Sequence, residues 1–166
     1  GLPLEYKILP EYFKEVGYRT SLVGKWHLGM SSEEYLPSQR GFDTTYGFMN
    51  GGIDYFKHTM SGRLDWHKNG NPLREEGYST ELIADEAIKI IQNKQSNKPL
   101  LLYVAFNAPH TPIQAPYEEI EKFNYIDDPK ERIYAANVSI LDKQIGRVIN
   151  AIKDNGLSSN TLILFF

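Results

Sequence analysis

The sequence feature that most constrains the fold is a pair of apolar runs without any alternation of polar and apolar residues. They occupy residues 100–106, Leu-Leu-Leu-Tyr-Val-Ala-Phe, and residues 161–166, Thr-Leu-Ile-Leu-Phe-Phe. A strand of this kind has no face suited to water, so both of its faces must be covered, as in a parallel sheet between helices. We therefore predict an α/β fold in which residues 100–106 form a central strand and residues 161–166 form another strand.

Helical spacing of apolar residues accompanies these runs in three segments. The segments are residues 4–16, which end at Gly17, residues 78–95, and residues 129–154, which end at Asn155-Gly156. Residues 19–24 read as a further strand, and the glycine-rich stretch 29–78 predicts long loops with small strands. Because an apolar strand end is a rare place for a native terminus, we expect a partial domain of a longer protein.

Composition excludes several classes of function. The chain has 166 residues, and its 21 acidic against 18 basic residues give a net charge of -3, so no overall positive field attracts nucleic acid. No apolar run is long enough to predict a membrane span. With no cysteine there is no thiolate nucleophile, thiolate metal site or disulfide within these residues. Partners of the nucleic-acid and membrane classes are therefore not expected.

The hexapeptide Gly-Lys-Trp-His-Leu-Gly at residues 24–29 is the first candidate for chemistry. If it is extended, Lys25 and His27 project to one face, while Trp26 and Leu28 anchor the other. An ammonium beside an imidazole suits a tetrahedral oxyanion, because one supplies fixed charge and the other moves a proton near neutral pH. The plainer interpretation is a surface lysine and a half-buried histidine.

A second histidine, His110, lies between Pro109 and Pro112 directly after the predicted strand 100–106. Proline stiffens such a loop, and loops at the carboxyl ends of parallel strands hold the ligands of open α/β sheets. Lys25, His27 and His110 could therefore form one basic pocket for a sulfate or phosphate group. His58 and His67 have no metal-ligand spacing and read as loop residues.

Several of these segments closely resemble the type I sulfatases, and arylsulfatase B-like members in particular. The segments are residues 17–29, 36–43, 109–112 and 162–166, and they occur in the family's order. The resemblance implies an alkaline phosphatase-like fold, with a mostly parallel sheet flanked by helices. Residues 1–166 would then be the central part of a sulfatase catalytic domain, and the compartment would be periplasmic, secreted or lysosomal.

The resemblance also implies roles for individual residues. The residue matching Lys25 binds sulfate and the formylglycine side chain, and the one matching His27 helps to deprotonate the formylglycine hydrate. The residue matching His110 contacts sulfate near the leaving oxygen. Asp54 and His58 lie where sulfatases often contact the sugar or aryl part of a substrate, so they are candidate substrate-binding residues, although loop aromatics more often close a local cluster.

Two parts of the family's machinery are missing from these residues. No proline has Cys or Ser two positions before it, so the formylglycine motif is absent. The calcium ligands are also expected outside this chain, since Asp127-Asp128 more plausibly caps the helix at 129–154. The predicted function is hydrolysis of small-molecule or carbohydrate sulfate esters, with a formylglycine and calcium supplied elsewhere, and this fragment alone is expected to be inactive. A phosphoesterase or phosphonate hydrolase, and a non-catalytic anion-binding module, are the alternatives.

Overall fold

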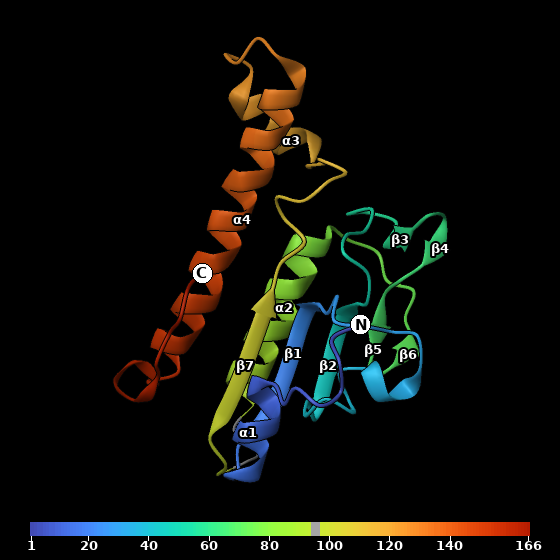
Figure 1. The fold of residues 1–166 in the computed structure, drawn as a ribbon. Coiled ribbons are helices and arrows are strands. Elements are labelled where there is room, and N and C mark those ends of the chain that lie inside the picture. The colour runs from blue at the N-terminus through green and yellow to red at the C-terminus, as the bar shows by residue number, and fades with distance from the viewer. Residues whose placement is uncertain (94–96) are drawn as a thin grey trace.

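The computed structural model describes residues 1–93 and 97–166 and contains a five-stranded sheet (Figure 1). The strand order is β6-β5-β2-β1-β7, and β1 pairs in parallel with both β2 and β7. The β5 strand pairs antiparallel with β2 on one side and with β6 on the other. A two-stranded hairpin, β3 with β4, lies apart from the main sheet. The bounds are Arg19–Lys25 (β1), Thr44–Phe48 (β2), Thr59–Met60 (β3), Arg63–Leu64 (β4), His67–Lys68 (β5), Asn71–Pro72 (β6) and Leu100–Ala105 (β7).

The helices agree in part with the sequence pattern. They are α1 (Leu9–Glu15), α2 (Ser79–Gln92), α3 (Tyr117–Ile120) and α4 (Pro129–Asp154), with short 3-10 turns at Glu33–Tyr35, Glu121–Phe123 and Ser158–Asn160. The α4 bounds confirm the predicted 129–154. The α1 helix begins later than predicted because Pro10, which has no amide hydrogen, stands in its first turn. The predicted end of α2 at 95 lies outside the described residues.

The two faces of β1 are buried against different partners, as alternation along a strand requires. Val23 belongs to a cluster that includes Ile83 and Ala87 of α2, so α2 covers one face. Leu22 points to the opposite face and packs with Trp26 and other residues near α1. Figure 1 shows α1 and α2 on opposite sides of the sheet. The sheet is therefore mixed and flanked by helices, with its parallel strands ending at one edge.

Two strand predictions are wrong in detail. The β7 strand lies at the edge of the sheet rather than at its centre, and Tyr103 is 37% exposed. Residues 161–166 form no strand, and Phe166 is 93% exposed, with its ring centroid 6.3 Å from that of Tyr103. An apolar run indicates that both faces of a strand are suited to burial. It does not indicate how many strands pair with that strand.

The long helix α4 packs on α2 and carries polar residues on its buried side. Asn137 and Gln144 are almost fully buried, while the apolar Ile149 of the same helix is 44% exposed. Asp128 caps the helix, as predicted, by accepting hydrogen bonds from the amides of Lys130 and Glu131. Within the part of the chain that the structure describes, no helix has the length and apolarity needed to cross a bilayer.

Candidate functional site

The first part of the site is the turn that follows β1. The Trp26 amide donates to the Phe48 carbonyl at 2.9 Å, and the His27 amide donates to the Met49 carbonyl at 3.0 Å. His27 has φ 56, in the left-handed region, so the chain is not extended through His27. The expected projection of Lys25 and His27 by strand alternation is thus wrong, because β1 ends at Lys25.

Trp26 anchors this turn, as the sequence predicts. The Trp26 side chain is 6% exposed, and its ring nitrogen donates to the carbonyl oxygens of Gly29 and Tyr35. These bonds tie the loop on both sides of His27, whose side chain stays exposed. A residue held in the left-handed region by its surroundings, with its ring facing out, is a frequent feature of functional sites.

The second part of the site is the loop after β7. The His110 amide donates to the Asn107 carbonyl at 2.9 Å, and His110 Nδ1 lies 2.7 Å from the Thr111 carbonyl oxygen. The His110 side chain is exposed, as a residue that meets a ligand must be. The loop therefore presents an imidazole at the same sheet edge at which β1 ends.

Two consecutive glycines bring the two imidazoles together. A Cβ atom on Gly51 would lie 2.7 Å from Cε1 of His27, and one on Gly52 would lie 2.8 Å from Nδ1 of His110. Any side chain at either position would therefore displace a ring. His27 and His110 are seated on adjacent residues of one backbone segment, although they are far apart in the sequence.

Lys25 supplies positive charge at the same edge. It is the last residue of β1, paired in register with Phe48, and its side chain is partly exposed. Within residues 1–93 and 97–166, no carboxylate lies within ion-pair distance of Lys25. Its charge is thus available to an anion.

Asp65 fixes the backbone that leads into the glycine pair. It is 5% exposed and accepts hydrogen bonds from the amides of Met49 and Asn50, each at 3.0 Å. The His67 ring nitrogen Nε2 lies 3.2 Å from Asp65 Oδ1, the oxygen that also accepts the Met49 amide. Burial alone would raise the pKa of Asp65, but the bonds from His67, Met49 and Asn50 together lower it to about 2. Asp65 is therefore an ionised structural acceptor.

Asp54, a candidate substrate-binding residue, accepts hydrogen bonds from neighbouring parts of the chain. Its Oδ1 accepts from the amides of Phe56 and Lys57, and its Oδ2 accepts from the Gln114 side chain at 3.0 Å. Partial burial would raise the pKa of Asp54, but these hydrogen bonds outweigh it and lower the pKa. Asp54 thus closes its own turn and joins it to the His110 loop.

His58, the other candidate substrate-binding residue, lies in the core. It is 1% exposed, its ring stacks on Trp66 with centroids 4.6 Å apart, and Nε2 is 3.0 Å from the Gly77 carbonyl oxygen. Burial lowers the pKa of His58. This geometry does not support the expected substrate contact, because a buried neutral ring has no surface for a ligand. His58 instead belongs to a local cluster with Trp66, the alternative given by the sequence.

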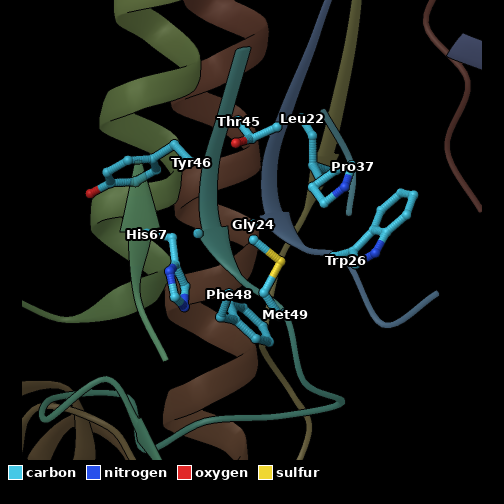
Figure 2. A pocket seen from close by; sticks show the side chains of 10 residues that line it. Leu22, Gly24, Trp26, Pro37, Thr45, Tyr46, Phe48, Met49 and His67 are labelled. Atoms are coloured by element: carbon cyan, nitrogen blue, oxygen red, sulfur yellow. The ribbon is translucent and has the colours of Figure 1, made fainter. Parts of the chain in front are cut away.

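Figure 2 shows a small cavity between His67 and Trp26, with Gly24 and Met49 between them. Its volume of about 10 Å³ admits at most one water molecule. His67, expected in a loop, lies in β5 and lines this cavity. A wider, open depression nearby is lined by residues that include Met30, Arg63 and His67.

The described residues do not fit a calcium site. Among residues 1–93 and 97–166, no three His, Asp or Glu side chains come together to hold a metal ion. The Asp127-Asp128 pair ends the loop before α4, where Asp128 is occupied as a helix cap. Calcium remains a prediction for other parts of the protein.

The residues that support the two histidines are not among those predicted from the sequence. Gly51 and Gly52 lie against the candidate rings, and Tyr55 donates hydrogen bonds to His110 and Gln114 in the loop after β7. The adjacent glycines were a signal, since two in succession often mark a close approach to another group. Nothing in the sequence marks Tyr55 or Gln114, because their partners lie more than 50 residues away.

Comparison with known proteins gives consistent results. A profile described as Sulfatase matches residues 1–166. Arylsulfatase J of Mus musculus is 38% identical over 172 residues, which cover 99% of this chain and 29% of that protein. An uncharacterized sulfatase of Escherichia coli, YdeN, is 33% identical over 190 residues, which cover 99% of this chain and 33% of that protein.

Solved structures agree with the fold. The crystal structure of Ps i-CgsB in complex with k-i-k-neocarrahexaose matches with a TM-score of 0.85 and 32% identity, over 97% of this chain and 39% of that one. The architecture is thus the alkaline phosphatase-like one, present here as a partial domain. The chain spans about a third of the length of the curated relatives it matches. This chain belongs to the sulfatase family.

Proposed function

We propose that the protein hydrolyses sulfate esters and that Lys25, His27 and His110 form the part of its active site lying in this chain. The observation that carries the proposal is the seating of two exposed imidazoles on Gly51 and Gly52, at the sheet edge where Lys25 also lies. Family membership supports the reaction class.

The three side chains suit the charge changes of sulfate transfer. The Lys25 ammonium would offset negative charge on the sulfate oxygens, while His27 would move a proton at the attacking group. His110 would hydrogen-bond the sulfate near the leaving oxygen and assist departure of the alcohol. The exposure of both rings supports this, since a catalytic group must reach the atom on which it acts.

The nucleophile and the metal are proposed to come from parts of the protein outside this chain. The family resemblance implies a formylglycine as nucleophile and a calcium ion beside it. The fragment alone would lack both and be inactive. The substrate class is a small-molecule or carbohydrate sulfate ester, and the k-i-k-neocarrahexaose bound by Ps i-CgsB supports the carbohydrate class. We place the enzyme in a periplasmic, secreted or lysosomal compartment, as in the family.

The test is hydrolysis of 4-nitrophenyl sulfate and 4-nitrophenyl phosphate by the full-length protein. We expect turnover of the sulfate ester and a fall in kcat/KM of about 100-fold or more for Lys25→Ala, His27→Ala and His110→Ala. Lys122→Ala is the matched control, because Lys122 pairs with Glu119 on the surface, and it should retain full activity.

The alternatives predict different results. Turnover of the phosphate ester alone would favour a phosphoesterase of the same superfamily. Sulfate binding that depends on these three residues, without any turnover, would favour an anion-binding module. Unchanged activity in all three variants would contradict the assignment of the site.

A further inference from the structure

We propose that Tyr55 is a positioning residue for His110, acting through hydrogen bonds that join residues 53–55 to the loop 107–114. The inference rests on the proposed function, in which His110 touches the substrate. It concerns how the chain holds that ring in place, because the ring itself is exposed, with Gly52 and the Thr111 carbonyl oxygen beside it.

Tyr55 binds the loop directly at the histidine. Its hydroxyl donates to the His110 carbonyl oxygen at 2.8 Å, and its amide donates to Gln114 Oε1 at 2.8 Å. Gln114 Nε2 in turn donates to Asp54 Oδ2 at 3.0 Å. The middle and the end of the loop are therefore attached to residues 54 and 55.

The start of the loop is attached to the same segment. The buried Asn107 side chain donates from Nδ2 to the Ile53 carbonyl oxygen at 3.1 Å. Residues 53–55 directly follow Gly51 and Gly52, against which the two imidazoles lie. One stretch of backbone, residues 51–55, thus contacts His27, contacts His110 and fastens the His110 loop.

The environment of Tyr55 keeps its hydroxyl protonated and therefore able to donate a hydrogen bond. The side chain is fully buried and stacks on Tyr78, with ring centroids 5.3 Å apart. Burial raises the pKa of Tyr55 to about 12, so the hydroxyl stays protonated. The Gln114 carbonyl is held from the other side by the Tyr78 hydroxyl and the Asn137 side chain, each at 2.8 Å. The attachment therefore rests on packed helices α2 and α4.

Tyr55→Phe in the full-length protein tests this inference. The variant keeps the buried ring and removes only the hydroxyl that holds the His110 carbonyl. We expect kcat/KM for a sulfate ester to fall about 10-fold, since a shift of a catalytic group by a fraction of an ångström has effects of this size. Tyr46→Phe is the matched control: it removes another buried tyrosine hydroxyl bond, to Glu75 at 2.6 Å, away from the two histidines.

A double-mutant cycle separates positioning from a merely structural role. If Tyr55 acts through His110, Tyr55→Phe should lower the activity of the His110→Ala protein by less than about twofold. An equal fall in both backgrounds, or no fall in the wild-type background, would overturn the inference. The side-chain NMR resonances of His110 give a readout that does not need turnover: Tyr55→Phe should shift them and Tyr46→Phe should not. Absence of shift would also contradict the inference, whereas a wild-type protein inactive on every sulfate ester would refute only the proposed function.

Discussion

Individual carboxylates hold the backbone turns on which the candidate site is built. Asp65 accepts the amides of Met49 and Asn50, just before the glycine pair, and Asp54 accepts those of Phe56 and Lys57, just after it. Both therefore fix the backbone on either side of Gly51 and Gly52, beside which the rings of His27 and His110 lie. Acidic side chains can lie close to the proposed basic pocket because backbone amide donors stabilise their negative charge.

Asp65 should make the stability of the wild-type protein depend on pH in a defined direction, and replacing it should remove that dependence. Its pKa of about 2 in the folded state is below the ordinary value, so its contribution is fully present above about pH 4 and is lost as the pH falls through about 2. We expect Asp65→Asn to lower the free energy of unfolding by roughly 2 kcal/mol at pH 7. Urea titrations of the full-length protein from pH 7 to pH 2 should show this difference shrinking.

Asp85→Asn is the control for that series. Asp85 pairs with Arg147 at 2.7 Å, but both side chains are more than 40% exposed, and an exposed pair contributes less than about 1 kcal/mol. A constant difference between wild type and Asp65→Asn at all pH values would mean that Asp65 is not stabilised as a carboxylate.

At the scale of elements, the parts governed by local chemistry could be predicted from the sequence. The α4 helix has its predicted bounds because Asp128 caps its start and Gly156, with φ 70, follows its end. The positions of β7 and residues 161–166 could not be predicted, because strand neighbours depend on the whole sheet. The three basic residues of the proposed site stand in short sequence motifs, whereas the backbone around them depends on contacts between distant segments.

The segment 51–55 is the element whose geometry the site needs most. We expect Gly51→Ala to lower kcat/KM by about 10- to 100-fold, because its Cβ would lie 2.7 Å from the His27 ring and force it to move. Gly146→Ala is the matched control, since nothing lies within 4 Å of its Cβ in α4. It should leave activity unchanged and raise stability by about 0.5–1 kcal/mol. Equal activities in steady-state assays of both variants would contradict the close approach at Gly51.

At the scale of the whole molecule, the chain holds the residues of the proposed site and the scaffold behind them. The sheet brings the ends of β1, β2 and β7 to one edge, α2 covers a face of it, and α4 supports the His110 loop through Asn137. This arrangement accounts for a family match along all 166 residues in a chain that spans about a third of its relatives.

The central claim is that Lys25, His27 and His110 bind one anion. A crystal structure of the full-length protein with a non-hydrolysable aryl sulfamate tests it most directly. We expect Lys25 Nζ and a ring nitrogen of each histidine at about 3 Å from the sulfamate group or its leaving oxygen. A sulfamate bound elsewhere, or one that leaves the His110 ring without contact, would contradict the account.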